Sequence, residues 1–381
     1  MGKIELDHTG SGSGVTLSSD GTDLLLDGTA IGGGGGGAAL ELYAENPSSP
    51  TAPSATGTNA VAIGDDAVAS GIASVAFGQQ TDATGTNAIA IGSGAQATQP
   101  HAVAIRGTAS ARESTAIGVN NLANGAVAAG EGSMSLQGSY ASGSDSFAAA
   151  ITTNSASYGA TGQYGVAIGR QSKASGSNST AIGSFRATAS GSQSIALGYF
   201  STASSSYAVS IGSSVTADVT KAFALGYEAK SSIKGKFAYS AQAFSAAGDA
   251  QTGIFVLRSD TTDATAEAMT TDNSAGSTDD QIILPNNSAY AFHGTIVARE
   301  SATDGTECAA WKVEGLIRRE GSAGTTVLVN SATTVLDNTP SWGLALSADT
   351  TNGGLKVEAT GAASTNIRWV ATIHTSEVTY A

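Results

Sequence analysis

The chain has 381 residues, of which 49 are Gly and only 13% are charged, and its net charge is −14. This acidic balance opposes binding to nucleic acid, which needs clustered Lys and Arg against the phosphate backbone. The single cysteine, Cys308, excludes an intrachain disulfide framework. The four histidines lack the spacing of metal ligands, so the sequence predicts no metal and no cofactor.

A leader occupies residues 1–31 and has the pattern of a β-hairpin. Its two apolar stretches flank Asp20-Gly21, and Asp-Gly is a strong hairpin-turn signal. The apolar positions that we expect to contact a partner are Val15, Leu17, Leu24 and Leu26. A two-stranded hairpin is barely stable alone, so the leader is expected to pair with copies of itself or with another protein. No signal-peptide core precedes it, and no run approaches the roughly 18 apolar residues that span a membrane, so membrane insertion is not expected.

Residues 32–56 link the leader to the next segment. Gly32 to Gly37 form an unbroken glycine run, which is typical of a flexible linker. No Lys-Ser or Lys-Thr pair follows the run, as a phosphate-binding loop would require. Three prolines then stop any helix before the segment ends.

Residues 57–234 form a repeat array. The phrase Asn59-Ala60-Val61-Ala62-Ile63-Gly64 returns along this segment, with a large apolar residue after Ala at steps that are usually 14 residues long. The step is 12 after Ile105 and 15 after Ile182, and a small residue follows six positions later, as at Ala111. The large apolar positions, which we expect to pack within the roll or between chains, are Ile63, Phe77, Ile91, Ile105, Ile117, Ile168, Ile182, Leu197, Ile211 and Leu225.

Each repeat predicts one coil of a β-roll with two short strands, because Val61 and Ile63 alternate with Ala62. Coils stack about 4.8 Å apart, so about a dozen would make a rod of about 60 Å. A coil this small encloses little volume and leaves an apolar strip exposed unless chains associate, so a closed homotrimer is expected. The beat weakens over residues 131–164, and Ala129 takes the place of a large apolar residue, so we expect a loop or distortion there.

Residues 235–381 predict an antiparallel β-sandwich or jelly roll. About nine stretches have the pattern of strands and none that of a helix, and all three tryptophans lie here. The alternation is clean where Trp311 and Val313 oppose Lys312 and Glu314, which indicates one buried and one wet face. The whole chain is therefore predicted to be all-β.

Residues for chemistry are sparse in this last segment. Glycan cleavage would need paired carboxylates, and a calcium site would need several. The candidates lie among small polar residues, which favours solvated loops: Asp260, Asp263, Asp272, Asp279 and Asp280. The tryptophans could pack in the core or stack on a sugar. Loops carry recognition on rigid scaffolds, so the expected receptor contacts are Asn286, Asn287, Asp304, Thr306 and Trp342. The chain is predicted not to be an enzyme.

The repeat phrase resembles the head repeat of trimeric autotransporter adhesins, the YadA-type repeat. That family's repeats form a left-handed parallel β-roll wound as a trimer, so the resemblance implies this fold for residues 57–234. Arg106 departs from the motif, because it replaces the glycine. The leader, glycine run, shaft and C-terminal β domain are together similar to tail fibres and other receptor-binding proteins of tailed bacteriophages, rather than to an autotransporter with a signal peptide and membrane anchor.

This resemblance implies a homotrimeric virion fibre that is extracellular when it functions. Its leader would attach to a phage tail or capsid protein, and its C-terminal domain would bind a host-surface glycan or protein. Two alternatives remain open: a purely structural virion component, such as a capsid decoration or tail-tip protein, and a bacterial surface adhesin.

Overall fold

The computed structural model describes residues 4–6, 15–19, 24–26, 29–30, 49, 51–118, 125–149, 157–301 and 305–380. Over these residues the protein is all-β apart from one 3-10 turn, η1 (Ala323–Thr325). Four short strands of the leader form an antiparallel sheet in sequence order: β1 (Ile4–Leu6), β2 (Val15–Ser19), β3 (Leu24–Leu26) and β4 (Thr29–Ala30). The expected hairpin is thus the centre of a four-stranded sheet.

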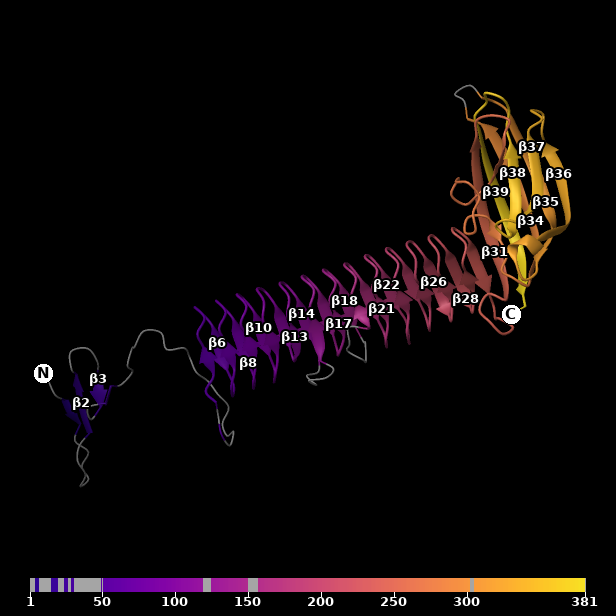
Figure 1. Ribbon diagram of the computed structural model, residues 1–381. Helices are drawn as coiled ribbons and strands as arrows, with labels where there is room; N and C mark the ends of the chain where they lie inside the picture. The colour runs from indigo at the N-terminus through magenta and orange to yellow at the C-terminus, as the bar shows by residue number, and fades with distance from the viewer. Residues whose placement is uncertain are drawn as a thin grey trace.

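The shaft is a β-solenoid of stacked coils (Figure 1). Each coil contributes one strand to each of two parallel sheets. The first sheet contains β6 (Val61–Ile63), β8 (Val75–Phe77), β10 (Ile89–Ile91), β12 (Val103–Ile105), β14 (Thr115–Ile117), β16 (Met134–Leu136), β18 (Phe147–Ala149), β20 (Val166–Ile168), β22 (Thr180–Ile182), β24 (Ile195–Leu197), β26 (Val209–Ser213), β28 (Phe223–Tyr227) and β30 (Phe237–Ser240).

The second parallel sheet has 13 strands, two or three residues long. They are β5 (Ser54–Ala55), β7 (Val68–Ala69), β9 (Asp82–Ala83), β11 (Gln96–Ala97), β13 (Gly107–Ala109), β15 (Ala126–Ala128), β17 (Tyr140–Ala141), β19 (Gly159–Ala160), β21 (Lys173–Ala174), β23 (Thr188–Ala189), β25 (Thr202–Ala203), β27 (Thr216–Ala217) and β29 (Lys230–Ser231). Turns at the two corners of each coil place residues in the left-handed region, such as Asn59 at φ 60° and Asp66 at φ 54°.

The interior of the shaft is filled by alanine and serine. Ala62, Ala76 and Ala90, at the centre of successive first-sheet strands, are at most 1% exposed, and Ala69 of the facing sheet is fully buried. The two sheets are close because a coil of about 14 residues has little room, so only small side chains fit between them. The flanking large residues therefore point outward.

The repeat beat persists where the sequence analysis expected a distortion. Leu136 pairs with Ile117, 19 residues earlier, and Ile168 pairs with Ala149, again 19 residues earlier. The coils between residues 131 and 164 are therefore regular, and the extra residues lie outside the strands. The assignment of Ala129 to a large apolar position is wrong, because Leu136 occupies it.

The 12-residue step also shifts a small position. Ala109, not Ala111, pairs with Ala97 and is buried. The two residues missing from this coil are therefore lost from the corner that precedes β13.

The tip is a β-sandwich with strands at a steep angle to the shaft (Figure 1). One layer has the order β31 (Ala250–Thr261), β39 (Ile367–Thr379), β34 (Ser288–Glu300), β35 (Cys308–Arg319) and β36 (Val327–Asp337), all antiparallel. In the other layer, β38 (Gly354–Thr360) pairs with β37 (Gly343–Asp349), β32 (Ala266–Ala268) and β33 (Ile282–Ile283). Trp369, Phe255, Leu257 and Val357 are fully buried between the layers.

One sheet runs from the shaft into the tip. The last parallel strand, β30, pairs antiparallel with β31, so backbone hydrogen bonds continue from the shaft into the sandwich. Below this junction Lys236 donates to the carboxylate of Glu377 at 2.6 Å, with side chains 3% and 0% exposed. The pair joins the last shaft coil to β39, and together with the shared sheet it ties the tip to the shaft.

Candidate functional site

The shaft presents its large apolar residues to the outside of the chain. Phe77 is 52% exposed, Ile182 38% and Ile91 37%. The remaining large repeat residues are partly buried, and they lie in register along the first sheet, as Ile91 does beside Ile105. A single chain thus carries an apolar stripe along its shaft, and such stripes mark interaction surfaces. The packing role predicted for these residues falls on contacts outside the single coil.

The sandwich has a base beside the shaft and a rim at its opposite end. The base is where β31 and β34 begin and β39 ends, since Ala250 pairs with Val378 and Ser288 with Thr379. The rim is where β31 ends and β39 begins, since Thr261 pairs with Ile367. Every strand of the first layer spans this distance, so the two loop sets are separated by the full height of the tip.

The predicted receptor contacts divide between these ends. Asn286 and Asn287 are exposed in the turn before β34, at the base. Thr306 is exposed at the rim, and Asp304 lies outside the described residues. Trp342 is 5% exposed and packs against Trp369 with ring centroids 6.0 Å apart, so the expectation that it contacts a receptor is corrected. Its indole is part of the core because β37 folds over the first layer.

Four loops form the rim, and short polar residues dominate them. They join β31 to β32, β34 to β35, β36 to β37 and β38 to β39, and cover residues 262–265, 301–307, 338–342 and 361–366. Ser301 of one loop donates its backbone N–H to Asn366 of another at 2.8 Å. Asn338 is fixed by two hydrogen bonds to the backbone of Trp342, at 2.8 and 2.9 Å. The rim therefore offers hydrogen-bonding groups on a braced frame.

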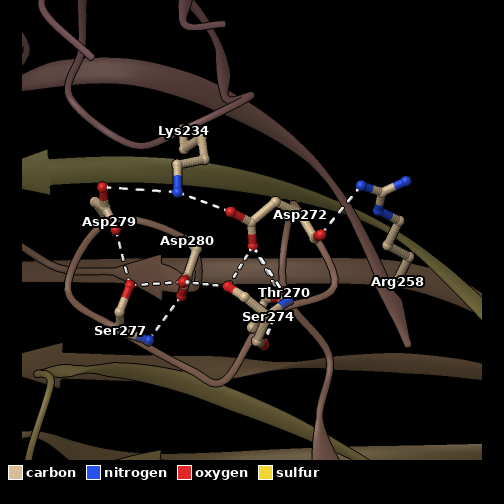
Figure 2. Close-up of polar contacts among 8 residues, drawn as sticks. All are labelled: Lys234, Arg258, Thr270, Asp272, Ser274, Ser277, Asp279 and Asp280. Atoms are coloured by element: carbon tan, nitrogen blue, oxygen red, sulfur yellow. Dashed lines mark hydrogen bonds and ion pairs between the residues drawn. The ribbon is translucent and has the colours of Figure 1, made fainter. Parts of the chain in front are cut away.

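The candidate carboxylates also divide between the two ends. Asp260 and Asp263 lie near the rim, whereas Asp272, Asp279 and Asp280 gather around Lys234 at the end of the shaft (Figure 2). Lys234 Nζ lies 2.7 Å from Asp272 and 3.9 Å from Asp279.

Two serines organise the three clustered carboxylates. Ser274 and Ser277 donate hydroxyl hydrogen bonds that link them, at 2.6 Å from Ser274 to Asp272 and 2.6 Å from Ser277 to Asp280. The cluster thus pins the loop of residues 271–281 onto the shaft.

Electrostatics fix the charge state of this cluster. The hydrogen bond from Lys234, with help from Ser274, lowers the pKa of Asp272 to about 2. A glycosidase acid must instead hold its proton near neutral pH, so Asp272 cannot serve as a general acid. No group of three or more His, Cys, Asp or Glu residues in the described part of the chain could hold a metal ion. The cluster therefore acts as a structural clamp between tip and shaft.

Two features of the tip were not visible in the sequence. His293 and His374 lie directly opposite each other on β34 and β39, with nearly parallel rings 5.3 Å apart. A cavity of about 370 Å³ lies at the base, lined by Lys236, Gln251 and Tyr290 among others. Both combine residues more than 50 positions apart, and no local spacing signals such pairs. Burial raises the pKa of the Tyr290 phenol well above its usual value.

Comparison with known families identifies the shaft repeats. Residues 55–81, 83–105, 109–136, 160–185 and 189–214 match the YadA head domain repeat. The repeat resemblance is thereby confirmed, and the shaft consists of YadA-type repeats. No curated protein sequence matches the chain. No helix among the described residues is long and apolar enough to cross a membrane.

Solved structures that are similar to the chain are tailspike proteins of phages. The tailspike of Acinetobacter baumannii bacteriophage Fri1, a capsular polysaccharide depolymerase, has 10% identity and a TM-score of 0.24 over 76% of this chain. The tailspike of Acinetobacter phage vB_ApiP_P1 has 10% identity and a TM-score of 0.15 over 81% of this chain and 76% of its own. That of A. baumannii phage AM24 has 10% identity and a TM-score of 0.19 over 84% of this chain and 56% of its own. The chain spans 40% of the Fri1 tailspike's length.

The prediction that the chain is not an enzyme is contradicted by this comparison. The Fri1 tailspike is a depolymerase, so the proteins with similar structures include enzymes. Sparse and scattered carboxylates in the sequence were an insufficient reason to exclude catalysis, because topology decides which carboxylates meet. The prediction is corrected accordingly.

Proposed function

We propose that this chain is a receptor-binding tail protein of a bacteriophage, with its rim as the surface that meets the host. The observation that carries the proposal is the continuous sheet from a shaft of YadA-type repeats into a sandwich whose polar loops gather at the end opposite the shaft. A rigid spacer that ends in braced polar loops suits recognition of a surface at a distance. The target class that suits these loops is a host-surface glycan, which presents hydroxyl groups to hydrogen-bonding side chains.

The same proposal assigns the other parts. The leader attaches the chain to a phage tail or capsid protein, and the apolar stripe of the shaft is the contact between three copies. The trimer is supported by the exposed stripe on a coil too narrow to bury its large residues. The protein is then part of the virion and works outside the cell.

Two measurements test the proposal. Antibodies raised against the full chain, viewed by electron microscopy, should label the tails of the phage particles. Purified protein should compete with phage for adsorption to host cells. Label on a bacterial surface instead would support the adhesin alternative, which the YadA-type repeats favour.

Substitutions locate the recognition surface. Thr306→Arg and Ala363→Arg place bulk and charge on exposed rim positions and should abolish competition. Asn286→Arg makes the same change at an exposed base position and should leave competition intact. Loss of competition by the base variant alone would move the receptor site to the base, where the sequence analysis placed part of it.

A further inference from the structure

One part of the shaft differs in charge from the rest of the chain. No acidic residue lies between Asp145 and Asp218, although the chain as a whole has a net charge of −14. The same stretch contains Arg170, Lys173 and Arg186. It is therefore a cationic band on an anionic protein, and such a band attracts anionic ligands.

The one 15-residue repeat lies within this band. Its extra residue falls in the corner between β22 and β23, which contains Phe185. Neighbouring corners are stacked by backbone hydrogen bonds: Arg186 N–H donates to the carbonyl of Arg170 at 3.0 Å, and Phe200 N–H to that of Phe185 at 2.9 Å. Three successive corners thus bring their side chains together on one edge of the shaft.

The rings on this edge form an exposed cluster. Phe200 meets Phe185 edge-on at 5.1 Å and Tyr199 edge-on at 4.7 Å. Tyr199 is 46% exposed and Phe200 37%. Rings held this way present flat apolar faces to solvent, and exposed aromatic clusters mark binding surfaces.

Two guanidinium groups frame the rings. Arg170 Cζ lies 4.8 Å and Arg186 Cζ 5.1 Å from the centre of the Phe185 ring. Arg186 Nε also donates to Gln171 at 2.9 Å, which fixes its orientation. Neither arginine has a carboxylate within ion-pair distance in the described part of the chain. Their remaining N–H groups are thus available to an anion from outside.

We propose that these five residues, Arg170, Phe185, Arg186, Tyr199 and Phe200, form a binding patch for a carboxylated polysaccharide. Aromatic faces pack against the C–H faces of sugar rings, and each guanidinium can hold a carboxylate through paired hydrogen bonds. A polymer with one carboxylate per sugar matches two arginines on neighbouring corners. Nucleic acid fits less well, because its dense charge is opposed by the protein's overall charge. This patch is separate from the rim and does not depend on the receptor site proposed there.

Defined polymers test the proposal with the full-length protein. Affinity is measured for polygalacturonate and polysialic acid, with dextran as the neutral comparison. The wild type should bind at least one acidic polymer and not dextran. The double variant Arg170→Gln/Arg186→Gln, and separately Phe200→Ala, should each lose about tenfold or more in affinity.

Matched controls come from elsewhere on the shaft. Arg112→Gln removes an exposed arginine that pairs with Glu131 at 3.1 Å, and Tyr207→Ala removes a ring that is 53% exposed on the other corner of the coil. Both should bind as the wild type does. Circular dichroism checks that all variants are folded.

Three results would overturn the proposal. The first is that neither acidic polymer binds, or that the patch variants bind as tightly as the controls. The second is that a single-stranded oligonucleotide binds the patch as well as the polysaccharides do. The third is that Phe200→Ala changes the sedimentation mass, which would show that a second copy of the chain covers the patch. Adsorption to host cells can persist in each case, so the rim proposal is judged separately.

Discussion

At the scale of single residues, the shaft depends on glycine at its corners. Gly198 has φ +126°, and a Cβ there would lie 1.9 Å from the carbonyl oxygen of Gly212 in the next coil. Both the backbone conformation and the contact exclude a side chain. Arg106 stands at an equivalent position with φ 51°, which a non-glycine residue tolerates at a cost.

Gly198→Ala should therefore destabilise the shaft by about 2–4 kcal/mol. Gly321→Ala is the matched control, because nothing lies within 4 Å of a Cβ at that position. The free energy of unfolding from denaturant titration measures both. Equal stability of the two variants would contradict the stacking geometry of the coils.

The buried pair at the junction carries a second prediction. Glu377 also accepts hydrogen bonds from Thr375 at 2.7 Å and Gln251 at 2.8 Å, and burial lowers the pKa of Lys236 while Glu377 opposes that effect. Glu377→Gln leaves the ammonium without a counter-charge and should cost about 3–5 kcal/mol. Lys236→Met in the same background should recover most of this loss.

The exposed pair of Lys312 and Glu314, 55% and 58% exposed, is the comparison for that experiment. Glu314→Gln should change stability by at most about 1 kcal/mol. A loss from Glu377→Gln no larger than this would show that the junction pair is not needed.

At the scale of elements, the loop of residues 271–281 is held to the shaft by charge. Asp272 has its pKa lowered to about 2 by Lys234, so its stabilising contribution is complete above the unfolded value of 3.8. As pH falls from about 4 through about 2 the carboxylate is protonated and the contribution is lost. The tip should therefore loosen from the shaft in this acid range.

Asp272→Asn should lower stability by about 1–2 kcal/mol at neutral pH and flatten the melting temperature between pH 4 and pH 2. The melting temperature by calorimetry across this range is the measurement. Asp66→Asn, at an exposed corner of the shaft, serves as control and should leave the profile unchanged. An unaltered acid profile in Asp272→Asn would mean that other groups govern the loop.

At the scale of the whole molecule, the apolar stripe predicts the oligomeric state. Sedimentation equilibrium of the full chain should give three times 37.4 kDa, about 112 kDa. Ile91→Asp with Ile182→Asp puts charge on stripe positions that are 37% and 38% exposed, and should shift the protein toward the monomer. Ser190→Asp, at an exposed position off the stripe, should not. A monomeric wild type would refute the trimer.

The tip shows how far strand prediction from sequence extends. Eight of the expected stretches are strands of the sandwich, because their apolar residues alternate over long runs, as in β35. Phe237 to Tyr239 is a strand but belongs to the parallel sheet of the shaft. The three-residue β32 (Ala266–Ala268) escaped prediction, since Ala-Glu-Ala carries no alternation of large residues.

The sequence by itself determined the coil, its period and the sandwich, because a repeated phrase and a period-two alternation are local properties of the chain. It also established that Val61 and Ile63 share a face. Only the tertiary structure decided which face is inside. In a coil this narrow the space between sheets admits alanine alone, so the large residues that usually define a core lie on the outside. Pairing across the fold likewise placed Asn287 and Thr306 at opposite ends of the tip and brought Arg170 beside Phe185, since contacts between distant residues depend on register rather than on local pattern.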